Sequence, residues 1–169
     1  MSDFSKVAAS QPEHAWIPTY RTPEEIAYPN PKNRWVGYPY TKYMVANDNI
    51  DGAAAWYICS VKTARRLGIP EAQWVYQHGG AHVHEGTEQW HVTARPELSL
   101  MPGMHTAITS CFESAGVSPS QLQYLDLYSC FPCVVQIAAD SLGMAHDDPR
   151  GFTMTGGLPF YGQFACSSG

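Results

Sequence analysis

Residues 104–143 read MHTAITSCFESAGVSPSQLQYLDLYSCFPCVVQIAADSLG and carry the clearest structural pattern in the chain. Apolar side chains recur at helical spacing over residues 104–115, and Gly116 supplies the stop. Residues 122–127 are predicted as a strand, and the apolar spacing of residues 134–142 predicts a second helix. The stretch therefore predicts a helix–strand–helix unit.

Similar alternation continues on both sides of this unit. Residues 53–59 form a short apolar run of the buried-strand type, and residues 62–67 predict a short helix. Further strands are predicted at residues 73–76 and 152–155. Strands that alternate with helices indicate an α/β fold, with a mixed or parallel sheet that helices cover.

The first 50 residues differ in composition from the rest. They are rich in proline and aromatic residues, and proline at this density prevents long helices. Residues 1–50 are therefore predicted to form an irregular but ordered segment, and residues 51–169 the α/β part. Residues 77–100 are polar and poorly patterned.

The composition limits the classes of partner. The chain has 169 residues, 44% of them hydrophobic, which fits a globular protein with a core. Its net charge of -5 argues against nucleic acid or an anionic membrane as partner. Only 15% of the residues are charged, which indicates that a partner subunit or further chain covers part of the surface.

No targeting or membrane segment is predicted. The start, MSDFSKVAAS, lacks the apolar centre of a signal peptide, and the apolar run at 53–59 is too short to span a bilayer. Five cysteines without secretory context favour a reducing compartment. We expect a soluble, cytoplasmic protein.

Two clusters of metal-ligating or redox-active residues have alternative interpretations. Four histidines lie among Glu85 and Glu88 in the sequence: His78, His82, His84 and His91. Their spacing matches no zinc signature. A polar loop or pocket rim is therefore favoured, and no metal is expected. Cys130 and Cys133 flank Phe-Pro at the start of the second predicted helix, as in thioredoxin-like redox sites. The order of the preceding elements does not fit a thioredoxin, so both cysteines also fit an ordinary helix start.

Two further groups are candidate ligand contacts. Tyr128 and Ser129 lie at the corner between the strand and the helix, where α/β sheets commonly bind ligands. Tyr128 can donate a hydrogen bond and Ser129 can orient water, although either can simply cap the helix. Gly156 and Gly157 follow the last predicted strand and allow close approach of a ligand to the backbone.

Several segments in order resemble the thiolase superfamily. The stretch NDNIDGAAAWYICS at residues 47–60, with Ala-Arg-Arg-Leu-Gly at 64–68, resembles a thiolase strand and the helix that follows it. Residues 111–116 and 122–131 resemble the next helix, strand and catalytic corner. Residues 152–157 resemble the Asn-Gly-Gly strand of thiolases. The likeness is greatest to the acetyl-CoA acetyltransferase group related to sterol-carrier-protein thiolases, which shares these further segments: residues 15–19, 33–34, 40–42, 126–132 and 148–151.

The resemblance implies a thiolase-like layered α/β fold that is incomplete and corresponds to the C-terminal part. The half that carries the acyl-accepting cysteine in thiolases has no counterpart here, so no cysteine inherits that role. Tyr128, Ser129 and Cys130 occupy the catalytic corner, and Gln163 stands where thiolases have the histidine of Gly-His-Pro. The resemblance places Phe131, Gly156 and Gly157 on the substrate side.

The leading hypothesis is thus a thiolase-like acyl-CoA acyltransferase fragment or degenerate subunit. It would act on a CoA thioester without a cofactor and would be inactive alone, because glutamine does not titrate near neutral pH. The implied partners are acyl-CoA and either further copies of the chain or a chain that supplies the missing half. The alternatives are a non-catalytic partner subunit and a thiol–disulfide oxidoreductase that uses Cys130 and Cys133.

Overall fold

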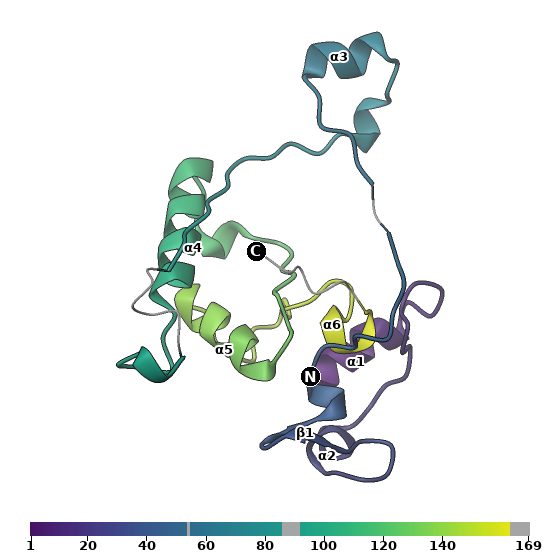
Figure 1. Cartoon of the computed structure of the whole chain (residues 1–169). Helices are drawn as coiled ribbons and strands as arrows, with labels where there is room; N and C mark the ends of the chain where they lie inside the picture. Colours follow the sequence, from purple (N-terminus) through teal and green to yellow (C-terminus); the bar gives the residue numbers. More distant parts are fainter. Residues whose placement is uncertain (54, 86–91, 163–169) are drawn as a thin grey trace.

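Two helices, α4 (Pro102–Ala115) and α5 (Pro132–Ser141), lie beside each other in the main body of the protein (Figure 1). The computed structural model describes residues 1–53, 55–85 and 92–162. Both helices confirm the sequence prediction and begin with a proline, which suits the first turn because it needs no N–H donor there. Gly116, at φ 66°, ends α4 as predicted.

The other helical elements are short. They are α1 (Ser2–Ala9), α2 (Pro23–Ala27), η1 (Lys42–Met44), α3 (Val61–Arg66), η2 (Glu71–Gln73), η4 (Val92–Ala94), η5 (Pro119–Gln121) and α6 (Gly157–Phe160). Helix α3 confirms the helix predicted at 62–67, whereas α1 was not predicted. No helix in the described ranges is long and apolar enough to cross a membrane.

The strand predictions are wrong for the residues that the structure describes. Within the described residues, the one sheet is an antiparallel pair, β1 (Trp35–Gly37) and β2 (Tyr40–Thr41), in the segment predicted to be irregular. A mixed or parallel sheet is therefore not formed by the part of the chain that the structure describes. The described helices and the small sheet nevertheless fit the predicted α/β class.

Among the residues that the structure describes, none of the predicted strands has a strand partner. The described residues of 53–59 are extended and exposed, and 73–76 begins in η2. A single backbone hydrogen bond, 3.0 Å from Leu127 N to Phe152 O, joins 122–127 to 152–155. A strand needs a neighbour for its backbone groups, and the local pattern cannot supply one.

The first 50 residues pack against the C-terminal part of the chain. Phe4 and Ala8 of α1 share a buried cluster with Ile26 of α2, Val135 of α5 and Phe160 of α6. A second cluster, around Leu125, Leu142 and Met144, joins α4 to α5. The division of the chain at residue 50 stays a prediction.

Arg150 fastens two loops to each other. Its Nη1 donates to the carbonyl oxygens of Pro119 and Leu122, at 2.8 and 3.1 Å. Its Nε and Nη2 donate to the two carboxylate oxygens of Asp148, each at 2.8 Å. The segment after α4 is thereby tied to the turn that follows α5.

The Asp148–Arg150 pair predicts a pH-dependent stability. The hydrogen bonds from Arg150 lower the pKa of Asp148 from 3.8 to about 2. The ionised pair therefore stabilises the fold above pH ~4, and this contribution is lost as the pH falls through about 2. We expect the Asp148→Asn variant to melt below the wild type at pH ~5 and together with it near pH ~2.

Thermal melts followed by circular dichroism measure this difference, with Asp147→Asn as the control at the adjacent exposed carboxylate. A melting difference of equal size at both pH values would contradict the assigned role of the pair.

Candidate functional site

The corner at residues 128–131 leads directly into α5, as predicted. Phe131 is the residue before the first helical turn and has extended backbone angles, φ -142° and ψ 150°. The Cys130 carbonyl accepts a hydrogen bond of 3.1 Å from Ala46 N, which ties the corner to the N-terminal segment. The corner is thus connected both to α5 and to the N-terminal segment.

Ser129 anchors the corner from inside. Its side chain is fully buried, and its Oγ accepts a hydrogen bond of 2.9 Å from Leu158 N at the start of α6. This bond satisfies one of the first N–H groups of α6, which have no partner within the helix. The hydroxyl therefore connects the corner to α6. Its catalytic role remains a prediction.

Tyr128 and Cys130 form the exposed side of the corner. The Tyr128 side chain is half-exposed and hydrogen-bonds to the Cys130 thiol. Burial raises the pKa of Cys130 and outweighs the opposite effect of this bond. The thiol therefore stays protonated at neutral pH, which is the reverse of what a nucleophilic or redox-active cysteine requires.

Tyr40 of β2 completes the corner and was not among the predicted site residues. Its ring lies 5.3 Å from that of Phe131, and its hydroxyl hydrogen-bonds to Cys133. This hydrogen bond, together with burial, raises the pKa of Tyr40 to about 12. Tyr40, Tyr128 and Phe131 thus give the corner an aromatic wall.

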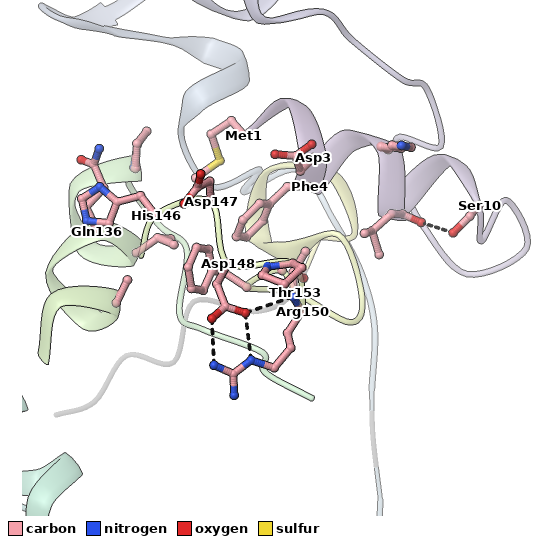
Figure 2. Close-up of a pocket in the computed structure, with 18 residues that line it drawn as sticks. Met1, Asp3, Phe4, Ser10, Gln136, His146, Asp147, Asp148, Arg150 and Thr153 are labelled. Atoms are coloured by element: carbon pink, nitrogen blue, oxygen red, sulfur yellow. Dashed lines mark hydrogen bonds and ion pairs between the residues drawn. The ribbon is translucent and has the colours of Figure 1, made fainter. Parts of the chain in front are cut away.

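A cavity of about 720 Å³ lies between α1, α5 and residues 146–153 (Figure 2). It is adjacent to the corner because Pro132, the first residue of α5, lines it. Phe4, Val135 and Phe152 supply apolar surface. Asp148 and Arg150 neutralise each other at its edge. The volume lies in the range of small-molecule sites.

Gly156 and Gly157 lie buried under α1. Both have positive φ, 106° and 68°. A Cβ at Gly156 would lie 2.5 Å from Ala8 Cβ, and one at Gly157 would lie 2.5 Å from Ser129 Oγ and 2.6 Å from Phe4 Cδ1. The packing of α1 explains glycine at both positions, and their contact with substrate stays a prediction.

Hydroxyl groups hold this glycine turn in place. Thr153 Oγ1 accepts a hydrogen bond of 2.9 Å from Gly156 N and donates to Asp126 Oδ1 at 3.2 Å. Thr155 Oγ1 donates to Asp126 Oδ2 at 3.3 Å. Asp126 thus connects the segment before the corner to the glycine turn, a link between residues far apart in sequence.

Three of the remaining predicted residues, His78, His82 and His84, are not brought to the corner. They lie exposed on the segment between α3 and α4. His91 and Gln163 lie outside the described residues. Among the residues that the structure describes, no group of three or more histidines, cysteines or acidic residues could hold a metal ion.

Comparison with known proteins identifies the fold. No family model matches the chain, and no curated protein matches it. Among solved structures, it is similar to a monomeric SCP2-thiolase-like protein type 1 from Mycobacterium smegmatis, with 37% identity and a TM-score of 0.79. The match covers 96% of this chain and 35% of that chain.

The predicted thiolase-like fold is therefore confirmed. The chain spans about a third of the length of the structure that it matches, with a coverage of 35%. Its assignment to the acetyl-CoA acetyltransferase group, and to the C-terminal part of such a protein, stays a prediction.

Proposed function

We propose that the chain is a component of a thiolase-like acyltransferase that binds a CoA thioester but does not turn it over alone. The single observation that carries the proposal is the 37% identity to an SCP2-thiolase-like protein over 96% of the chain. The acetyl-CoA acetyltransferase group is the proposed affiliation. Thiolysis or Claisen condensation of a CoA thioester, in cytoplasmic lipid metabolism, is the proposed chemistry of the complete assembly.

The aromatic corner and the neighbouring cavity support binding of an acyl or pantetheine chain. Phe131 and Tyr128 are 41% and 47% exposed, so their rings offer apolar contact area to a flexible thioester. The cavity beside Pro132 provides a largely apolar space for the rest of the chain. Gly156 and Gly157 keep their proposed place on the substrate side.

The same residues support the absence of turnover. Thiolysis needs a thiolate nucleophile and a group that moves a proton near neutral pH. Burial raises the pKa of Cys130, and the Ser129 hydroxyl already accepts the Leu158 N–H. Gln163 carries an amide, which does not titrate in this range. The proposed contribution of this chain is therefore binding, with the reacting groups supplied by another polypeptide.

A titration with acetoacetyl-CoA, followed by calorimetry, tests the binding. We expect saturable binding that falls about 10-fold in the Phe131→Ala variant, because the ring's contact area is lost. Leu98→Ala is the matched control, since Leu98 is also exposed and does not line the cavity. Absence of saturable binding, or equal affinity in the Phe131→Ala variant, would contradict the proposal.

A further inference from the structure

Residues 55–77 project from the rest of the structure and are called here the projecting unit (Figure 1). The unit contains α3 and η2 between two extended segments, 55–59 and 74–77. Ser60 caps α3 by accepting a hydrogen bond of 3.2 Å from Thr63 N, and Trp74 Nε1 donates to the Ile69 carbonyl at 3.1 Å. The unit thus has a definite internal structure.

The two extended segments carry large exposed apolar side chains. Tyr57, Ile58 and Val75 are 94%, 88% and 95% exposed, and Trp56 and Tyr76 are also exposed. A hollow of about 960 Å³ lies between the segments. Apolar surface gathered in this way on a soluble protein marks an interaction site.

The pattern of these side chains indicates the interior of a sheet. Successive residues of a strand point to opposite faces, so Tyr57 presents one face and its neighbours Trp56 and Ile58 the other. Both faces are therefore apolar, as in a strand that is covered on both sides. In the described part of the chain, residues 55–59 also form no backbone–backbone hydrogen bond. An occupant must therefore supply a strand and a layer on each face, which a short peptide cannot do.

The similarity to the Mycobacterium smegmatis protein indicates what kind of molecule covers the exposed apolar surface of the projecting unit. The Mycobacterium smegmatis structure is described as monomeric, and this chain covers only 35% of it. In that protein, any cover for the equivalent surface comes from its own remaining polypeptide. Residues 55–61 of this chain carry no charge, whereas the rest of the projecting unit carries Lys62, Arg65, Arg66 and Glu71, with Arg65 paired to Glu71.

We propose that the projecting unit is the docking surface for a polypeptide that carries the remaining part of the thiolase-like fold. This polypeptide adds a strand along residues 55–59 and covers both faces of the segment. The inference rests on the proposed function only for the kind of partner, because the exposed surface itself is independent of any acyl-CoA chemistry.

Co-expression tests the docking surface. The full chain is produced together with the part of the Mycobacterium smegmatis protein that lies outside the match, and the complex is measured by light scattering after size exclusion. We expect a one-to-one complex, with slowed hydrogen exchange at residues 55–59. The Ile58→Asp variant should weaken the complex about 100-fold, because it places a charge in the new sheet.

Ile58→Asp should leave the isolated chain folded, since Ile58 is 88% exposed. Leu98→Asp, at an exposed leucine outside the projecting unit, is the matched control and should still bind. Failure to form a complex, or equal affinity of the Ile58→Asp variant, would overturn the proposal. A dimer of the chain alone that Ile58→Asp dissociates would also overturn it.

The outcome is separable from that of the acyl-CoA titration. A complex that is lost with Ile58→Asp supports the docking surface even if the chain does not bind acetoacetyl-CoA. Binding of acetoacetyl-CoA without any complex would support the proposed function and overturn the docking surface.

Discussion

The Gly156→Ala variant should lose about 3 kcal/mol of unfolding free energy. Gly156 has a φ of 106°, in a region that residues with a Cβ rarely adopt. The added Cβ would also lie 2.5 Å from Ala8 Cβ and 2.9 Å from Ala8 Cα. Because Ala8 belongs to α1, relief of the contact requires the whole helix to move off the buried cluster that it shares with Val135 and Phe160.

Urea unfolding followed by tryptophan fluorescence measures this loss. Gly143→Ala is the matched control, since Gly143 also has a positive φ, 67°, but no atom lies within 4 Å of an added Cβ. The control should lose only about 1 kcal/mol, from backbone strain alone. Equal losses in the two variants would show that the contact between Gly156 and α1 contributes nothing to stability.

The Asn33→Leu variant should lose about 4 kcal/mol of unfolding free energy. Asn33 is fully buried, and its Nδ2 donates to the carbonyl oxygens of Glu25, Ile26 and Tyr28 at 2.9, 3.0 and 3.3 Å. Its Oδ1 accepts a hydrogen bond of 2.9 Å from Tyr43 N. Leucine has a similar volume and leaves these backbone groups without their partner.

The same urea experiment measures this variant, with Asn49→Leu as the control. Asn49 is exposed, and its side chain donates only to Asp48, at 3.0 Å, so its replacement should change stability by less than about 0.5 kcal/mol. A small loss for Asn33→Leu would mean that this asparagine does not organise the segment from α2 to η1.

The helices were predictable because the signals that define each one lie within its own stretch of sequence. The spacing of apolar residues in α4 and α5, with Gly116 at the end of α4, is local and needs no knowledge of the rest of the fold. Helix α1 was not predicted because the high proline content of residues 1–50 was taken to apply to the whole segment. Residues 1–9 contain no proline. The strand predictions failed because an apolar run such as 53–59 specifies burial but not its neighbour.

The position of residues 128–131 directly before α5 was predicted, because the apolar spacing of the helix is local. The roles of these residues in a site stay predictions. The burial of Ser129 beneath Leu158 N, and the approach of Tyr40 to Phe131, join residues 29 and 91 positions apart. Nothing in a local pattern specifies such pairs. The predicted ligand contact of Gly156 stays a prediction, and the structure shows in addition that the absence of a side chain there leaves room for Ala8.

The most direct test is an incubation of the pure 169-residue chain with acetoacetyl-CoA and free CoA, followed by equilibrium dialysis and mass spectrometry of every CoA species. The proposed function predicts that acetoacetyl-CoA is retained by the protein and that no acetyl-CoA forms. Formation of acetyl-CoA would show that the chain holds a working nucleophile and base. Failure to retain acetoacetyl-CoA would show that it is not a CoA-thioester-binding component.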